Sequence, residues 1–286
     1  MTIISTYTSH LHSMPFDVSI TFACYNASQY TKWCIESLRE AGTSLDRVVV
    51  IDNGSTDDTR DYLSSIQLGG RIFNHSNLGC GVAWNQGILH QQAEWTIVMN
   101  NDVLVHPGWT DKMIHAAIRH GLKVVSPALI EGKLDYDYIG LAQDAQSKMA
   151  DALRTPTAHA VCLCIHKSVF QDVGFFRATP SLLGYEDGIF FNDLRNHGIP
   201  RGITGASWLH HFGSVTQSLM KQEKGIELGD VLVKHNDRKL LQQSWVERKL
   251  TRMRRKRMER QWREQELAQY GMTLHGERLN GEFIWR

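Results

Sequence analysis

Residues 48–55 read Val48-Val49-Val50-Ile51-Asp52-Asn53-Gly54-Ser55. The first four residues are all apolar and β-branched, which is typical of a strand that is covered on both faces. The polar residues that follow can form a turn and cap a helix over residues 57–66. A buried strand that leads directly into a helix predicts a parallel α/β sheet, with Asp52 at the carboxyl edge of its strand.

The same alternation extends on both sides of this stretch. Apolar runs at 18–23, 71–73 and 95–99 predict further strands, and the segments 28–40 and 79–91 have helical spacing. Strand and helix thus alternate four times, which is typical of a parallel sheet flanked by helices. Ligands of such sheets bind beyond the carboxyl ends of the strands. Three polar clusters are expected to meet there: Tyr25-Asn26, Asp52 to Ser55, and Asn100-Asn101-Asp102.

The pattern is less regular after Pro107. We predict a helix at 109–120, a strand at 122–126, a loop or short hairpin at 131–156, a strand at 158–165 and a helix at 186–196. Residues 207–214 close the α/β pattern, and the composition then changes. The expected organisation is an N-terminal extension (1–16), a catalytic domain (17–215) and a helical, basic C-terminal region (216–286).

The composition argues for an ordinary globular protein. The 286 residues are 42% hydrophobic, and 31 basic residues nearly balance 30 acidic ones. The five cysteines suit neither a disulfide framework nor a zinc knuckle, which favours a reducing, cytoplasmic location. No secretory signal and no apolar stretch of about 20 residues is visible, so we expect no membrane span.

Asp52 and the helix after Asn77 are two candidate nucleotide contacts. The Asp52 carboxylate can accept hydrogen bonds from a nucleotide base or from ribose hydroxyls; the alternative is turn chemistry plus a helix cap. Between Asn77 and Gly87, small residues allow a backbone to approach a ligand, with Asn77 and Asn85 as polar contacts; the alternative is close helix–sheet packing. The motifs G-x-G-x-x-G and G-x-x-x-x-G-K-[ST] are absent, which argues against nicotinamide redox chemistry and P-loop phosphoryl transfer.

Two further constellations concern a metal and a base. Asp102 and one histidine of the pair His210-His211 can hold a divalent cation only if phosphate oxygens complete its coordination; the alternative is that these are structural histidines, of which the chain has 14 in all. Asp187 is a candidate general base that removes a proton from an acceptor hydroxyl. The alternative for Asp187 is favourable interaction with the dipole of the helix that it begins.

Taken together, these segments resemble the family 2 glycosyltransferases, inverting enzymes with the GT-A fold that binds nucleotide sugars, and within them the bacterial rhamnosyltransferase-like branch. The resemblance covers about residues 17–215. The matching segments are Val18 to Asn26, Val49 to Asp57, Asn77 to Gly87, Asn100-Asn101-Asp102, Gly184-Tyr185-Glu186-Asp187 and His211-Phe212-Gly213-Ser214.

The resemblance implies a role for each matching residue. Asp102 is the metal-binding acid of the DxD-type motif, His211 or else His210 completes the Mn²⁺ or Mg²⁺ site, and Asp187 is the catalytic base. Tyr185 and Glu186 are expected on the acceptor side. Asp52 contacts the nucleotide base, and the implied donor-binding residues are Tyr25, Asn26, Asp52, Asn53, Asn77, Asn85 and Asn101.

This sequence departs from the family pattern at two places. Asn100 occupies the position of the first carboxylate of the DxD-type motif. After Asp187 the family often continues with an acid and then an arginine, where this chain has Ile189 and Asp193. A competing hypothesis is therefore a nucleotide-sugar-binding module with little turnover.

Residues 246–265 contain nine basic and three acidic residues at helical spacing. Three interpretations are open: a helix packed on its own domain, a peripheral contact with an anionic membrane, or a nucleic-acid contact that includes a nucleic-acid acceptor. A peripheral contact suits a glycan or lipid-linked acceptor at the inner face of the membrane.

Overall fold

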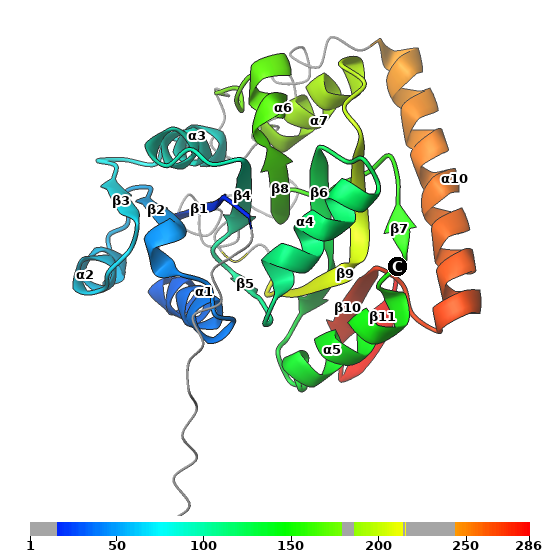
Figure 1. Ribbon diagram of the computed structural model, residues 1–286, viewed down its shortest axis with the longest axis horizontal. Coiled ribbons are helices and arrows are strands. Elements are labelled where there is room, and N and C mark those ends of the chain that lie inside the picture. Colours follow the sequence, from blue (N-terminus) through cyan, green and yellow to red (C-terminus); the bar gives the residue numbers. More distant parts are fainter. Residues whose placement is uncertain (1–15, 179–185, 214, 216–243) are drawn as a thin grey trace, which may run out of the picture.

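The computed structural model describes residues 16–178, 186–213, 215 and 244–286 (Figure 1). Four parallel strands form one half of its sheet in the order β3-β2-β1-β4. Their register places Cys24 beside Asp52 and Ala23 beside Asn100, so the carboxyl ends lie side by side. This confirms the predicted parallel sheet. The strands are β1 (Val18–Cys24), β2 (Val48–Asp52), β3 (Gly70–Phe73) and β4 (Trp95–Asn100).

Helices cover both faces of these strands, which explains why the first four residues of β2 are all apolar. Val48 and Val50 belong to the core beneath α1, whereas Val49 and Ile51 pack with α3 on the other face. Gly87 lets α3 approach the sheet, because a Cβ at this position would overlap the Thr21 side chain. The helices of this half are α1 (Ser28–Glu40), the short η1 (Leu45–Arg47), α2 (Thr59–Ser65) and α3 (Cys80–His90).

The other half of the sheet is mixed. Strand β8 runs antiparallel between β4 and β6, and β6 pairs in parallel with the long strand β9. The strand predicted at 122–126 begins at Val124 and continues to Gly132, and residues 207–211 are the end of an eleven-residue strand. The elements are β5 (Val103–Leu104), α4 (Trp109–Arg119), β6 (Val124–Gly132), β7 (Leu153–Arg154), β8 (Cys162–His166), α6 (Lys167–Asp172), α7 (Glu186–Asn196) and β9 (Arg201–His211).

The prediction of a loop or hairpin at 131–156 is wrong, because helix α5 (Tyr138–Met149) occupies most of it. Asp137 caps this helix by accepting a hydrogen bond from the Gly140 N–H at 3.0 Å. Its buried face consists of Tyr138, Ala142, Ala145 and Met149. Two of these four residues are alanines, so the apolar period is weak in the sequence although the helix is well packed.

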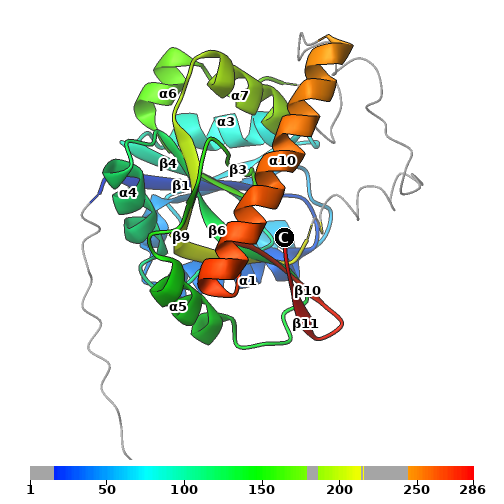
Figure 2. The same cartoon turned by 90° about the vertical axis from the view of Figure 1, so that its right-hand side faces the viewer.

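The C-terminal region contains a helix, as expected, but also two strands. Helix α10 (Trp245–Tyr270) is followed by β10 (His275–Leu279) and β11 (Glu282–Trp285). Figures 1 and 2 show α10 running along one side of the molecule toward this hairpin. Strand β10 pairs in parallel with β6, so the hairpin extends the same sheet. Within the described residues, no helix is long and apolar enough to cross a bilayer.

A buried ion pair fixes the end of α10 to strand β7. Arg154 on β7 makes two hydrogen bonds of 2.7 Å to the Glu266 carboxylate, and both side chains are less than a tenth exposed. Glu266 also accepts a hydrogen bond from the Leu274 N–H at 2.8 Å, directly before β10. These contacts position the C-terminal hairpin at the edge of β6.

Candidate functional site

Asp52 is fully buried at the end of β2. Its carboxylate accepts hydrogen bonds from the Ser55 N–H at 3.2 Å and from Arg60 Nε at 2.6 Å. Arg60 also donates to the Asn74 carbonyl oxygen. The sequence indicated Asp52 but not Arg60, which lies on the first turn of α2 and neutralises the buried carboxylate.

Asparagines connect the loops around Asp52. Asn53 Nδ2 donates to Asn77 Oδ1 at 3.0 Å, and Asn77 Oδ1 also accepts the Gly79 N–H at the start of α3. Asn26, after β1, has a left-handed backbone (φ 51°) and accepts the Thr56 N–H at 2.8 Å. Three of the predicted polar segments, after β1, after β2 and before α3, therefore meet at one edge of the sheet.

Two of the residues predicted to contact the nucleotide-sugar donor, Asn85 and Asn101, make hydrogen bonds within the protein. Asn85 donates to the Phe176 carbonyl oxygen at 2.7 Å and accepts the Phe176 N–H at 3.1 Å. Asn101 is buried and donates to Thr31 Oγ1 at 3.0 Å. In these positions the two amides tie the segment after α6 to α3, and the end of β4 to α1.

Asp102 and His211 are brought together by the pairing of β5 with β9, in which Val103 lies opposite His211. Asp102 Oδ1 lies 3.3 Å from His211 Nε2, and both residues are at most 3% exposed. The Asn100 side-chain nitrogen lies 3.4 Å from the same ring nitrogen. The distant acid and histidine that the sequence indicated therefore face one another in the folded chain.

His210 points to the other face of β9, because successive residues of a strand alternate. Its Nδ1 lies 2.8 Å from the Tyr136 hydroxyl, and its ring packs edge-on against Tyr136 and Phe212. Burial lowers the pKa of His210 to about 4, so the ring is neutral at pH 7. The geometry distinguishes the two histidines: only His211 has a ring nitrogen in contact with Asp102.

Glu131 and His275 adjoin this pair, and the sequence analysis missed both. Glu131 Oε1 lies 2.9 Å from His211 Nδ1, and Oε2 lies 2.9 Å from His275 Nε2. Hydrogen bonds from both imidazoles hold the pKa of Glu131 well below its usual range. Burial disfavours the charged ring of His211, yet hydrogen bonds to Asp102 and Glu131 raise its pKa to about 9. No local motif joins these residues, because they come from β6, β9 and β10.

Asp187 lies in the first turn of α7, which packs beside α3. Its Oδ1 accepts the Gly188 N–H at 2.7 Å, and burial raises the pKa of its carboxyl group. Burial and the nearby carboxylates of Glu186, Asp187 and Asp102 raise the pKa of the Cys80 thiol to about 12. These three acids therefore surround the start of α3. The predicted acceptor-side residue Tyr185 lies outside the described residues.

The donor set of Asp102 and His211 fits a hard divalent cation. Neighbouring ligands of an octahedral ion with bonds of about 2.1 Å lie about 3.0 Å apart, close to the observed 3.3 Å between Oδ1 and Nε2. In the parts of the chain described above, no group of three or more His, Cys, Asp and Glu side chains converges to hold a metal. Phosphate oxygens and water would have to supply the remaining ligands.

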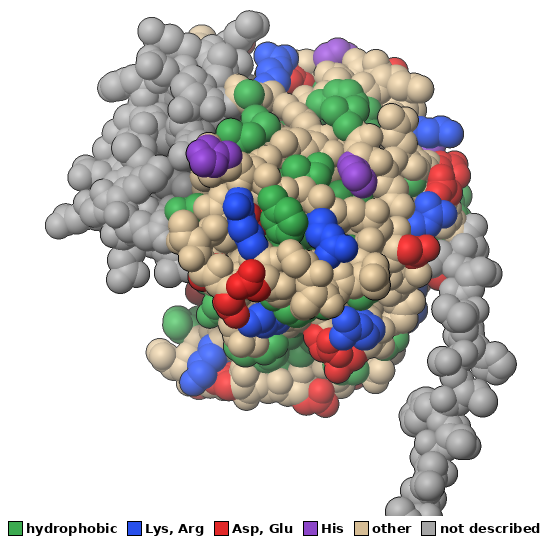
Figure 3. Space-filling view, turned by 90° about the vertical axis from the view of Figure 1, so that its left-hand side faces the viewer, with side chains coloured by type: hydrophobic (Ala, Val, Ile, Leu, Met, Phe, Trp, Pro, Cys, Tyr) green, Lys and Arg blue, Asp and Glu red, His purple; other side chains and the backbone are tan. Residues whose placement is uncertain are grey.

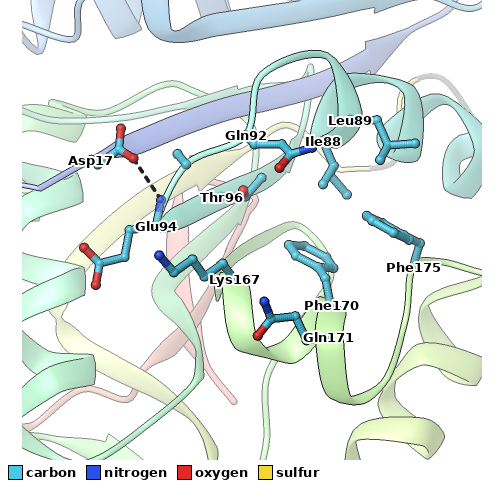
Figure 4. A pocket seen from close by; sticks show the side chains of 11 residues that line it. Asp17, Ile88, Leu89, Gln92, Glu94, Thr96, Lys167, Phe170, Gln171 and Phe175 are labelled. Atoms are coloured by element: carbon cyan, nitrogen blue, oxygen red, sulfur yellow. Dashed lines mark hydrogen bonds between the residues drawn. The ribbon is translucent and has the colours of Figure 1, made fainter.

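A separate hollow lies away from these residues. It has a volume of about 470 Å³ and lies between α3 and α6, near the amino ends of β1 and β4 (Figure 4). Lys167, Phe170 and Phe175 line one side of it, and Asp17 accepts the Glu94 N–H at 3.1 Å at its end. This is the edge of the sheet opposite to Asp52 and Asp102, so the hollow is separate from the candidate site.

The strand order, with a parallel half-sheet that carries polar residues at its carboxyl edge, is that of the GT-A class of fold. Residues 19–174, more than half of the chain, match the model of glycosyl transferase family 2. The chain belongs to that family.

Individual relatives are distant. EpsH of Bacillus subtilis (strain 168), described as a glycosyltransferase, is 25% identical over 103 residues, which are 35% of this chain and 30% of EpsH. S. aureus TarS (residues 1–349) superposes with a TM-score of 0.51 at 17% identity, over 68% of this chain and 60% of that one. The mannosyltransferase PcManGT of Pyrobaculum calidifontis, whose structure contains GDP-Man and Mn²⁺, has a TM-score of 0.51 at 17% identity, over 72% and 60%. The matches span less than two thirds of each of these relatives.

Proposed function

We propose that this protein transfers a sugar from a nucleotide-sugar donor to a hydroxyl group of a glycan or lipid-linked saccharide, by a single displacement with inversion. The observation that carries the proposal is the contact between Asp102 and His211 at the carboxyl edge of a GT-A sheet. The distant relative that contains GDP-Man and Mn²⁺ agrees with it. The rhamnosyltransferase-like branch stays a prediction.

In this proposal Asp102 and His211 hold Mn²⁺ or Mg²⁺. When bound, the cation neutralises the diphosphate of the leaving nucleotide. His210 takes no part in the metal site, because its ring contacts Tyr136 instead. Asp52, with Asn53 and Asn77, shapes the loops against which the nucleoside lies; Tyr25 and Asn26 follow the neighbouring strand. Asn85 and Asn101 support these loops from behind.

Asp187 is the base in the proposed reaction. Its carboxylate accepts the proton of the acceptor hydroxyl while the oxygen attacks the anomeric carbon. Burial raises the pKa of this carboxyl group, which makes its carboxylate a stronger base than that of an exposed aspartate. Glu186, at the N-terminus of α7, lies beside Gly81 of α3 and would face the acceptor side.

The test of the metal site is donor turnover with and without Mn²⁺. Wild-type protein is expected to release nucleoside diphosphate from one of a panel of nucleotide sugars only when Mn²⁺ or Mg²⁺ is present. Asp102→Ala removes one of the two protein ligands and is expected to lower this rate at least 100-fold, a loss in line with removal of a group that stabilises the leaving charge. Asp172→Ala, an exposed acid at the end of α6, is the control and keeps wild-type rates.

A nucleotide-sugar-binding module with little turnover is the second candidate. Asn100 favours it, because its amide nitrogen faces the ring nitrogen of His211 where the family has a carboxylate. The two candidates separate in one experiment. If nucleoside diphosphates raise the melting temperature of the protein but the whole panel yields no turnover with any acceptor, the binding module is correct.

For the partner of α10 we propose an anionic membrane surface. Val246, Leu250 and Met253 are about half exposed, and their spacing forms one stripe that Arg257 and Arg260 continue. Packing this stripe against a second copy would bury arginine against arginine, whereas lipid phosphates complement it. By contrast, acidic and basic side chains are interspersed over the face that carries α2 and β3 (Figure 3).

Replacing both Arg257 and Arg260 with glutamine tests this partner. Each cation near an anionic surface contributes about 1 kcal/mol, so the double variant is expected to bind phosphatidylglycerol vesicles roughly 30-fold more weakly in co-sedimentation. Arg119→Gln, an exposed arginine on α4, is the control with unchanged binding. Equal sedimentation of the double variant and wild type contradicts the proposal, as does binding to duplex RNA or DNA but not to vesicles.

A further inference from the structure

The carboxylate of Glu131 bridges two imidazoles that are far apart in the sequence. One oxygen contacts His211 Nδ1 and the other contacts His275 Nε2, both at 2.9 Å. The register of the sheet sets this arrangement, because Glu131 lies opposite His211 on one side of β6 and β10 lies on the other side. A line of four side chains thus runs from Asp102 through His211 and Glu131 to His275.

The contact with Glu131 determines which nitrogen of His211 can bind a metal. An imidazole that binds a metal has given up one proton and keeps one N–H and one lone pair. Glu131 lies 2.9 Å from Nδ1 and Asp102 lies 3.3 Å from Nε2, so the closer carboxylate favours keeping the remaining proton on Nδ1. The lone pair is then on Nε2, the nitrogen that faces Asp102 at 3.3 Å. When the far N–H of a metal-binding histidine donates a hydrogen bond to a carboxylate, this bond also fixes the orientation of the ring and strengthens it as a ligand.

His275 in turn fixes Glu131. The Glu131 side chain is about one third exposed, so without a second partner it could rotate toward solvent. His275 begins β10, which is brought to β6 by the buried Arg154–Glu266 pair and by the Leu274 N–H. The hairpin does not depend on His275 for its attachment, because backbone pairing over four residues of β6 already holds it.

We propose that Glu131 and His275 are positioning residues for the metal-binding imidazole of His211. The C-terminal hairpin, which carries His275, then contributes to the affinity of the metal site. This inference rests on the proposed roles of Asp102 and His211. The structural alternative is that the Glu131–His275 contact only attaches the hairpin to the sheet. The positioning role predicts that folded variants of Glu131 and His275 bind the metal more weakly, whereas the structural role predicts unchanged metal affinity.

The test measures Mn²⁺ affinity of the full chain by electron paramagnetic resonance of free Mn²⁺, with UDP and, in parallel, GDP present to supply phosphate oxygens. Glu131→Gln is expected to weaken Mn²⁺ binding about 10- to 100-fold, the usual loss when the outer partner of a metal-binding histidine is removed. His275→Ala is expected to give a smaller loss in the same direction. The glutamine side chain in His275→Gln can still donate a hydrogen bond to Glu131, so this variant should recover part of the lost Mn²⁺ affinity. Melting temperatures of the variants stay close to wild type.

Glu277→Gln is the matched control. Glu277 lies on β10, as His275 does, and is opposite Glu131 in the strand register. Its carboxylate, however, pairs with Arg286. Wild-type Mn²⁺ affinity in Glu131→Gln and His275→Ala overturns the inference while leaving the metal site intact. Absence of Mn²⁺ binding to the wild type with either nucleotide overturns the metal site itself, and the inference with it. Loss of affinity in His275→Ala without any recovery in His275→Gln also contradicts the positioning role.

Discussion

Asp187→Asn is expected to lower the turnover of sugar transfer by about 10²- to 10⁴-fold, the usual contribution of a positioned general base. Asparagine has the size of aspartate and can still accept the Gly188 N–H, but it cannot take a proton at neutral pH. Binding of nucleoside diphosphate and of Mn²⁺ is expected to stay unchanged, because Asp102 and His211 are intact. Turnover at saturating donor and calorimetric titration of the nucleotide measure these two quantities separately.

The pH profile gives a second measurement of the same role. Burial raises the pKa of Asp187, so the carboxylate that acts as base is populated only above a pKa higher than that of an exposed aspartate. The wild-type rate should therefore rise with pH through this raised pKa and then level off. The residual rate of Asp187→Asn lacks this rise. A variant that keeps wild-type turnover, or keeps the same acidic limb, shows that another group is the base.

Glu266→Ala is expected to lower the free energy of unfolding by about 3–5 kcal/mol, because it leaves the Arg154 charge buried without its partner. The hydrogen bond from the Leu274 N–H is lost as well. Urea unfolding, followed by tryptophan fluorescence, measures the change. Glu259→Ala is the control on the same helix; this exposed acid pairs with Arg255 one turn away, and its loss should change stability little.

A second substitution separates the charge effect from simple loss of packing. Replacing Arg154 with methionine and Glu266 with leucine together removes both charges, and much of the lost stability should return. If Glu266→Ala unfolds at the same urea concentration as the wild type, the ion pair does not hold α10 and the hairpin in place. The metal affinity of this variant then has no reason to change.

The sequence predicted the strands and helices of the first half well, because each rule acts on a short segment. The first four residues of β2 are apolar since α1 and α3 cover its two faces, and this pattern is visible within a short segment. The GT-A fold, which the resemblance to family 2 glycosyltransferases implied, was predicted correctly. Helix α5 was missed because alanines form half of its buried face and the surrounding residues are polar.

Residues of the candidate site could be predicted only where they belong to a short sequence motif. Asp102, His211 and Asp187 stand in recognisable motifs, and the structure places the first two in contact. Glu131 and His275 could not be found in this way, since 144 residues separate them and only strand pairing brings them together. Asn85 looked like a ligand contact, but its amide matches one backbone N–H and one carbonyl of Phe176, which no local pattern reveals.

The parallel pairing of β10 with β6 has a consequence for folding order. Contacts such as Glu131–His275 close a loop of more than 140 residues, and the entropy of closing it must be overcome before the contact gives any stabilisation. The four parallel strands near the N-terminus can assemble from neighbouring segments. The edge of β6, by contrast, stays unpaired until the C-terminal hairpin reaches it. An unpaired strand edge is a template for association with other chains. Until β10 pairs with it, the edge of β6 from Leu129 to Gly132 is such a template, and the hairpin covers it in the folded chain.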